Sequence, residues 1–261
     1  MPRSCNRVTR RTPPRTDTDK LDGACPCSSV VVHAYNKQMS SPLRSFVQYA
    51  PLERKRRLLS EKAPDWKARI KALATPPLVE FEVTKARACY AADPDPSRLR
   101  DGLMLVTGND TPVSAVGMDD LVRLHATLEP AASTLRSVPA PRILAGHEPL
   151  EAAAVPRALA RFFEWTASDA FGEMHPVEQM SLCQVRLCEI WPFEAGSGVT
   201  ADLFALLVLY RKTGLLPLFA PADIEVFREA LSDAFRFVTK ALVDLNRAGC
   251  ERACDELLGQ V

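Results

Sequence analysis

An apolar segment near residue 200 constrains the fold of this chain more than any other feature. Val199–Lys212 is apolar on almost every side of the helix that it predicts, with a Gly-Ser-Gly loop before it and Gly214 after it. A helix of this kind is stable only when other elements surround it. Its strongly apolar part, Leu203–Tyr210, is far shorter than the roughly 20 residues that a membrane span requires. The segment therefore predicts an all-α domain around a buried central helix.

Helical patterns recur on both sides of this segment, and strand patterns are nearly absent. The composition agrees, because 21 Pro and only 11 Gly fit helices with stiff connections better than a turn-rich β protein. Apolar spacing predicts four further helices, at Met118–Leu128, Val155–Trp165, Pro176 to about Ile190, and Asp223–Leu245. Nearer the N-terminus it predicts a helix at Asp65–Ala74 that ends at Pro76-Pro77, and a separate helix at Leu78–Tyr90.

These patterns divide the chain into four parts. Residues 1–38 have little to bury, and we expect them to be disordered or to be mis-annotated sequence before a true start at Met39. A basic organelle presequence is the alternative, although Asp17, Asp19 and Asp22 argue against it. An N-terminal helical region at 39–106, a main domain at 107–245 and a C-terminal helical tail at 246–261 would follow.

The charge balance argues against several classes of partner. With 33 Lys and Arg against 32 Asp and Glu, the net charge of +1 provides no field that would attract nucleic acid or a membrane surface. The basic run Arg54–Arg57 is therefore interpreted as the solvated face of a helix. The N-terminus lacks the apolar run of a secretory signal, so we expect a cytoplasmic protein whose eight cysteines are free thiols. Cys25 and Cys27 lack a second cysteine pair, and no metal site is expected.

The Gly-Ser-Gly loop is the one segment that indicates chemistry. The backbone N–H groups of Gly196, Ser197 and Gly198 and the N-terminus of the following helix would converge on one point, which suits a phosphate group. An ordinary turn between two helices is the alternative, because glycine is common in such turns. These three residues are the candidate cofactor-binding residues.

The wider motif resembles the Fic/Doc (Fido) family. It consists of His175-Pro176-Val177-Glu178, a helix, the segment I-W-P-F-E-A-G-S-G at residues 190–198, and the central helix. Members of the family carry H-P-F-x-[D/E]-G-N-G-R-x-x-R between two central helices. Three upstream segments are similar to family elements as well, namely an early helix at Met118–Leu128, a flap at Arg142–Leu150 and a helix at Val155–Trp165. The resemblance spans roughly Thr107 to Phe235 and implies a Fido-like helical fold with a short hairpin-like flap.

The resemblance also implies a chemistry whose key residues this chain lacks. The family's enzymes mostly transfer AMP from ATP to a protein hydroxyl group, and Doc-like members transfer phosphate. They use a His as general base, an acidic residue for Mg²⁺ and Arg side chains for the phosphates. This chain differs from the family at five motif positions. Trp191 stands at the position of the base, Ala195 at that of the metal ligand and Ser197 at that of the Asn. Val199 and Asp202 stand at the positions of the first and the second Arg.

Three functional hypotheses follow. The first is an inactive Fido domain that binds a protein segment at the flap near Arg142–Leu150 and needs no cofactor, with its Gly-Ser-Gly loop free to hold ATP or another nucleotide without Mg²⁺. The second is a divergent AMP- or phosphate-transferase in which His147 of the flap, or a base supplied by the target, replaces the missing base. The third is a purely structural helical domain. The oligomeric state and the identity of the partner stay open.

Other residues near the motif are predicted to have structural roles. His125 is expected to pack in the core, and His175 to lie at a helix N-terminus, too far from Trp191 to replace the base. Trp191 itself is expected to pack into the former pocket. The family's inhibitory helix carries [S/T]-x-x-x-E-[G/N], which no segment between Met39 and Asp110 matches. Its Glu would also lack a partner, because Asp202 stands where the family has the Arg that pairs with it.

Overall fold

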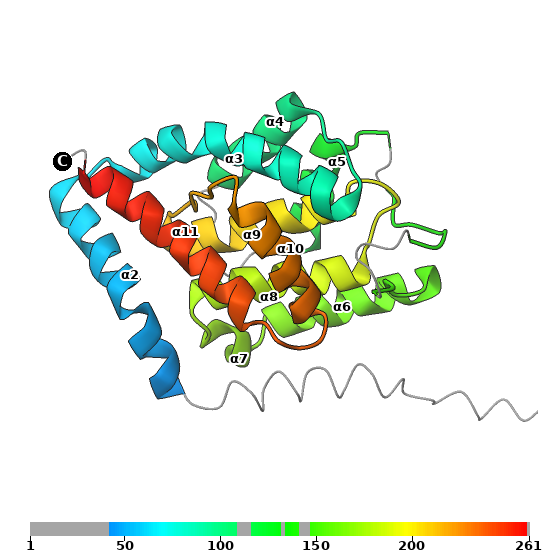
Figure 1. The fold of residues 1–261 in the computed structure, drawn as a ribbon. Coiled ribbons are helices and arrows are strands. Elements are labelled where there is room, and N and C mark those ends of the chain that lie inside the picture. Colours follow the sequence, from blue (N-terminus) through cyan, green and yellow to red (C-terminus); the bar gives the residue numbers. More distant parts are fainter. Residues whose placement is uncertain (1–41, 109–115, 132–133, 141–146, 260–261) are drawn as a thin grey trace, which may run out of the picture. The chain divides into compact units, whose positions relative to one another are not determined.

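The computed structural model describes residues 42–108, 116–131, 134–140 and 147–259. Within them the chain forms ten α-helices and a short 3-10 helix, η2 (Figure 1). The bounds of these helices are α2 Pro42–Lys62, α3 Trp66–Tyr90, α4 Pro96–Gly108, α5 Met118–Leu128, η2 Ala152–Ala154, α6 Val155–Thr166, α7 Asp169–Gly172, α8 Pro176–Ile190, α9 Ser197–Thr213, α10 Asp223–Ala234 and α11 Lys240–Gly259. The β-pairing in these residues is limited to one antiparallel bridge between Leu135 and Phe193. The all-α prediction is confirmed. Of the described helices, none combines the length and the apolarity that a membrane span requires.

The predicted central helix is α9, which other helices surround. It packs most extensively against α8 and also contacts α3, α4 and α5, so that nearly all of its residues are buried. Gly102 of α4 permits one of these close approaches, because a Cβ atom there would lie 2.5 Å from Cδ1 of Leu203. Gly214 ends the helix in a left-handed conformation (φ 73°), and its N–H bonds to the carbonyl oxygen of Tyr210. The apolar pattern thus predicted both the helix and its buried position.

The prediction that Pro76-Pro77 end a helix is wrong. α3 runs without interruption from Trp66 to Tyr90 with both prolines inside it. A proline in a helix interior removes a backbone hydrogen bond and typically costs about 3 kcal/mol. The helix nevertheless continues, because apolar residues on both sides of the prolines, such as Ile70 and Leu78, are buried in the same core. This continuity carries the last turns of α3 to the central helix.

The helix predicted at Asp223–Leu245 is instead two helices. α10 ends at Ala234, Phe237 adopts a left-handed conformation (φ 68°), and α11 begins at Lys240. α11 continues to Gly259 and packs against α2, α3, α8 and α10. The boundary placed between residues 245 and 246 therefore lies inside α11. No Gly or Pro marks the break at residues 235–239, and apolar spacing alone does not reveal it.

Two predicted segments lie wholly or largely outside the described residues. They are the N-terminal part, residues 1–38, and the flap, of which residues 147–150 are described. The remaining chain, residues 41–261, forms one compact unit. Its described cysteines are all buried and free, at Cys89, Cys183, Cys188, Cys250 and Cys254. No group of three or more candidate metal ligands occurs in the described part of the chain.

Candidate functional site

The loop between α8 and α9 takes its shape from two residues in left-handed conformations. Trp191 (φ 48°) ends α8, and its N–H bonds to the carbonyl oxygen of Leu187 at 2.8 Å. Gly196 (φ 69°) precedes α9, and its carbonyl oxygen accepts a hydrogen bond from the N–H of Thr200 at 2.9 Å. A Cβ atom at Gly196 would lie 2.9 Å from Cγ of Glu129. Glycine is therefore needed there for space as well as for backbone conformation.

The candidate phosphate-binding residues are covered by protein atoms. Residues 197–200, the first turn of α9, are all buried. The Ser197 hydroxyl donates to the carbonyl oxygen of Phe193 at 2.8 Å and accepts from its N–H at 2.7 Å, so this side chain is committed to the loop. The ring of Tyr90 lies against Gly198, where a Cβ atom would be only 2.5 Å from Cδ2. The first turn of α9 is therefore packed against Tyr90 on the side where a Cβ atom of Gly198 would lie.

Trp191 is buried beside the same tyrosine. It is 4% exposed, and its ring meets the ring of Tyr90 edge-on, with 6.0 Å between centroids. The indole Nε1 is buried without a hydrogen-bond partner among the described residues. Buried Trp side chains usually donate this N–H to a hydrogen-bond acceptor. Because no described residue accepts it here, the ring is held by packing. The expected burial of Trp191 is observed, and its indole offers no lone pair that could accept a proton.

A buried network of charged and polar groups joins α3 to α9. Nζ of Lys85 lies 2.6 Å from Oε1 of Glu82 and 3.0 Å from Oδ2 of Asp202, and these side chains are at most 2% exposed. Oδ1 of Asp202 accepts hydrogen bonds from Oη of Tyr90 at 3.1 Å and from Nε2 of Gln184 at 2.5 Å. No sequence motif marks this network, because its members come from three helices and Tyr90 is 112 residues from Asp202.

The network sets the protonation of its members. Burial raises the pKa of Glu82 to about 8, and the negative charge of Asp202 adds to this effect while Lys85 opposes it. Burial alone would lower the pKa of Lys85, but the two carboxyl groups beside it outweigh burial and raise that pKa. The ammonium group also lies 4.6 Å from the ring centre of Phe227. Lys85 therefore stays charged and neutralises Asp202 from within the protein.

Two histidines, one beside the loop and one at the opposite end of α8, have the structural roles that the sequence predicts. His125 is 0% exposed, its ring stacks on that of Phe193 with 3.6 Å between centroids, and its Nδ1 lies 3.2 Å from the hydroxyl oxygen of Thr200. His175 caps the N-terminus of α8, where Nδ1 accepts a hydrogen bond from the N–H of Val177 at 3.3 Å. Both predictions are confirmed.

The alternative base, His147, packs against the residue that follows α10. Its ring stacks on the ring of Phe235 with 3.8 Å between centroids and an interplanar angle of 4°. Nε2 is buried without a hydrogen-bond partner in the described part of the chain, and burial lowers the pKa of the imidazole. His147 is therefore a neutral, packed side chain. Its described ring contact is with Phe235 and not with the loop at residues 191–198.

A buried arginine that no motif marks holds the loop in place. Arg136 is 4% exposed and donates to main-chain carbonyl oxygens. Its Nε donates to Trp191 at 2.6 Å, while its terminal nitrogens donate to Val138 at 3.0 Å, to Ile190 at 3.3 Å and to Leu150. These bonds join Val138, which precedes the flap, and Leu150, its last residue, to the C-terminus of α8. An arginine in a proline-rich stretch carries no sequence signal of burial, so this role was not predicted.

Comparisons with known proteins identify the fold of this arrangement. No protein-family model matches the sequence, and no curated protein matches it. Among solved structures, Fic-1 from C. elegans is similar with a TM-score of 0.65 at 15% identity, covering 92% of this chain and 78% of that one. A Fic domain containing signaling protein from Bacteroides thetaiotaomicron has a TM-score of 0.53 at 15% identity, covering 87% and 93%. A Fic family protein from Desulfovibrio desulfuricans has a TM-score of 0.52 at 16% identity, covering 96% and 77%.

The chain has the Fic fold. At 15% identity the likeness establishes the fold alone. It also extends the Fic fold well beyond the part that the motif resemblance spans, roughly residues 107–235, because it covers 92% of the chain. In this Fic-fold chain, the space beside the N-terminus of α9 is filled by Tyr90, and the charge of Asp202 in the first turns is balanced by Lys85.

Proposed function

We propose that this Fic-fold chain acts by binding a protein segment and does not transfer AMP or phosphate. The observation that carries the proposal is the set of α3 side chains against the first turns of α9. Tyr90 fills the space beside Gly198, and Lys85 neutralises Asp202. The helix N-terminus therefore offers neither room nor free positive charge to a nucleotide. We propose that ATP and other nucleotides do not bind there, with or without Mg²⁺.

The residues at the family's catalytic positions support this proposal. By the resemblance, Trp191 stands at the position of the general base, whose loss alone commonly costs about 10²–10⁴-fold in rate. Ala195 stands at the metal-ligand position, is exposed and carries no oxygen ligand. Val199 and Asp202 stand at the two arginine positions, and both are buried. At these four motif positions the chain therefore has no base, no metal-ligating side chain and no cation that would neutralise phosphate charge.

The ion pair between Lys85 and Asp202 supports a permanently closed site. By the resemblance, the family's inhibitory helix places a Glu against the second Arg of the motif, and Asp202 occupies that Arg position. The partner of Asp202 in this chain is a lysine from α3, so an ion pair forms with the charges reversed. Both groups are buried, and opening the pair would leave charges without partners in the core. We infer that α3 stays closed on α9.

The proposed binding surface lies at the base of the flap, Arg142–Leu150. Val138, which precedes the flap, and Leu150, its last residue, are each 41% exposed although both are apolar. Their carbonyl oxygens accept hydrogen bonds from Arg136, which fixes these two residues. A partner peptide that adds in an extended conformation along the flap would cover these two side chains.

Label transfer and nucleotide binding test this proposal together. The full chain is incubated with Mg²⁺ and with ATP labelled on the α- or the γ-phosphate, alone and with a cell lysate, and ATP binding is measured by calorimetry. We expect neither transfer nor binding. Transfer by the unmodified chain that His147→Ala abolishes would overturn the proposal in favour of a divergent transferase.

Two sets of variants separate missing residues from a filled site. The first restores the family residues by Trp191→His, Ala195→Asp, Val199→Arg and Asp202→Arg. We expect no ATP binding in this set, because the ring of Tyr90 stays in place and Lys85 then faces an arginine. The second set adds Tyr90→Ala and Lys85→Glu, which open the space and supply an opposite charge. ATP binding in the second set alone would assign the obstruction to α3, whereas binding by the unmodified chain would contradict the proposal.

A further inference from the structure

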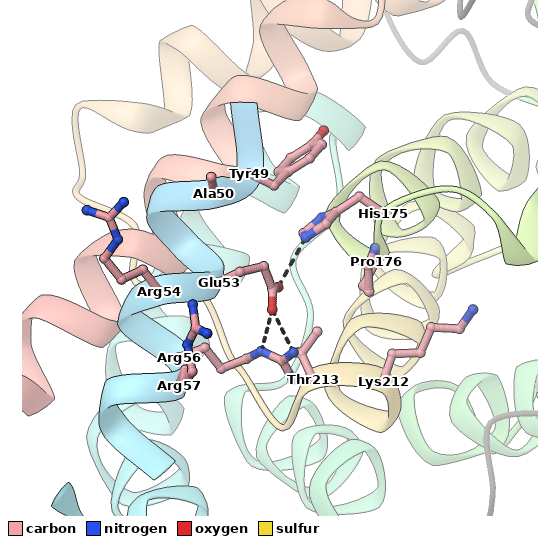
Figure 2. Close-up of a pocket in the computed structure, with 10 residues that line it drawn as sticks. All are labelled: Tyr49, Ala50, Glu53, Arg54, Arg56, Arg57, His175, Pro176, Lys212 and Thr213. Atoms are coloured by element: carbon pink, nitrogen blue, oxygen red, sulfur yellow. Dashed lines mark hydrogen bonds and ion pairs between the residues drawn. The ribbon is translucent and has the colours of Figure 1, made fainter. Parts of the chain in front are cut away.

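A cavity of about 470 Å³ lies at the end of α9 opposite the Gly-Ser-Gly loop (Figure 2). The residues important here come from α2, from the start of α8 and from the end of α9, namely Glu53, Arg54, Arg56, Arg57, His175 and Lys212. A neighbouring cavity of about 390 Å³ shares three of them and extends along α2 to Ser60. Small-molecule sites are commonly clefts of ~300–1,000 Å³, so both cavities have the size of a ligand site.

The charge of this cavity is strongly positive. Arg54, Arg56, Arg57 and Lys212 line it, and Glu53 is the carboxylate among its lining residues. Figure 2 shows Arg54 and Arg57 on one side, Lys212 on the other, and Glu53 with Arg56 between them. The chain as a whole is nearly neutral, at +1, so this local excess is a property of the folded arrangement.

Glu53, the one carboxylate among the lining residues, holds the side chains of Arg56 and His175 in position. Glu53 accepts hydrogen bonds from Nη2 of Arg56 at 2.6 Å and from Nε at 3.1 Å. It also lies 3.2 Å from Nε2 of His175, whose Nδ1 accepts from the N–H of Val177 and so leaves Nε2 to carry the proton. The hydrogen bond from His175 is the main cause that lowers the pKa of Glu53 to about 2. Glu53 thus stays ionised and fixes Arg56 in the wall of the cavity.

The other three cations have no carboxylate partner among the described residues. Arg54 and Arg57 are exposed on α2, whereas Lys212 is partly buried, and burial lowers its pKa. Arg211, the residue before Lys212, does have a carboxylate partner, because it lies 2.9 Å from Oδ1 of Asp120. Nζ of Lys212 lies 5.4 Å from the ring centre of Phe171, a contact that leaves its charge without an anionic partner in the described part of the chain. An anion in the cavity would supply that partner beside the exposed side chains of Arg54 and Arg57.

We propose that this cavity binds the phosphate group of a phosphomonoester. Guanidinium groups match phosphate oxygens with paired N–H donors, and a dianion balances several uncompensated cations better than a carboxylate does. Ala50 and Pro176 give the cavity apolar surface against which an organic group would pack. The rings of Tyr49 and His175, stacked with 3.7 Å between centroids and largely buried, support this wall. The phosphate is borne either by a small organic molecule or by a phosphorylated protein side chain.

Calorimetry with the full chain tests the proposal, using phenyl phosphate, inorganic phosphate, sulfate and a phosphoserine peptide as probes. We expect saturable binding of a phosphomonoester that is tighter than binding of sulfate at equal ionic strength, together with a rise in Tm on binding. Arg54→Glu with Arg57→Glu should weaken it about tenfold or more, because charge-assisted hydrogen bonds are lost. Lys212→Gln should weaken it as well.

A matched pair of charge reversals controls for net charge. Arg100→Glu with Arg161→Glu changes the charge equally at exposed positions on α4 and α6, and we expect unchanged affinity. Binding of the peptide but not of phenyl phosphate would assign the group to a phosphorylated protein. The proposal is overturned if neither monoester binds, if sulfate binds as tightly, or if the control pair weakens binding as much as the Arg54 and Arg57 pair.

Discussion

The two ends of α9 differ in whether a charged side chain has a partner of opposite charge within the described part of the protein. Beside its N-terminal turns, Asp202 is buried and faces Lys85, Tyr90 and Gln184 at hydrogen-bonding or ion-pair distance. Beside its C-terminus, Lys212 lies in a cavity wall without a described carboxylate partner. A charge removed from water must be compensated by the protein, whereas a partly solvated one keeps water that a ligand can replace. The first end is therefore a structural part of the core, and the second retains the capacity to bind.

Removing Lys85, beside the N-terminal turns of α9, should lower the stability of the protein more than any other change considered. Lys85→Met leaves the carboxyl groups of Glu82 and Asp202 buried without their cation. We expect the free energy of unfolding to fall by about 3–5 kcal/mol, as is typical when one partner of a buried pair is removed. Urea denaturation followed by circular dichroism measures it.

The triple variant that adds Glu82→Gln and Asp202→Asn to Lys85→Met is the control. It removes the charges together, so a large part of the lost stability should return. A single variant as stable as the unmodified protein would show that the charges are not buried in one network.

Filling the space beside the loop should have a smaller effect. A Cβ atom at Gly198 would lie 2.5 Å from the Tyr90 ring, so Gly198→Ala should cost roughly 1–3 kcal/mol through overpacking. Gly172→Ala is the matched control, because nothing lies within 4 Å of its Cβ position. Thermal unfolding should show a lower Tm for Gly198→Ala alone, with partial recovery when Tyr90→Leu is added. Equal Tm values for the two alanine variants would mean that the ring does not occupy this space.

The pH dependence of stability should differ in sign between the two ends. The pKa of Glu82 is raised from 4.5 to about 8, so the folded state binds more protons than the unfolded state in this range, and stability falls as pH rises from about 4.5 to about 8. The pKa of Glu53 is lowered from 4.5 to about 2, so its contribution is present above pH 4.5 and is lost as pH falls toward 2.

Urea denaturation over this pH range separates the two carboxyl groups. Glu82→Gln should flatten the decline between pH 5 and 8, and Glu53→Gln should flatten the decline below pH 4.5. If Glu82→Gln leaves the upper slope unchanged, Glu82 does not hold its proton in the folded state.

Substitutions in the cavity at the C-terminal end of α9 should change the stability of the protein least. Arg57 is exposed on α2, and Arg57→Glu should change the free energy of unfolding by no more than about 0.5 kcal/mol. A loss of several kcal/mol would show that the arginine is part of the folded framework and would remove the contrast between the two ends.

Several helices could be predicted because one face or the whole circumference is apolar. Met118–Leu128 is α5 as predicted, and His175 caps α8 because proline and glutamate after it are typical of a helix start. The prolines in α3 misled the prediction, because their local cost is smaller than the gain from burying residues on both sides. The break between α10 and α11 carries no turn residue, so spacing alone joined them.

The candidate site was predictable only in part. The turn at Gly196 and the burial of Trp191 follow from residue type and from the apolar neighbourhood. Tyr90 and Lys85 could not be assigned to the site, because no motif links their predicted helix, Leu78–Tyr90, to the loop, and Tyr90 is 112 residues from Asp202. Arg136 could not be assigned either, because its acceptors are main-chain carbonyl oxygens, which leave no trace in the sequence.

The sequence by itself determined that this chain is helical and that α9 is central, because periodicity and composition act locally and α9 is apolar all around. It also determined which residues flank the Gly-Ser-Gly loop. Only the tertiary structure decided what lies against that loop and which charges have partners. Those outcomes depend on contacts between residues far apart in the chain, such as Tyr90 with Asp202, and burial sets the energy of each charge only once the helices have packed.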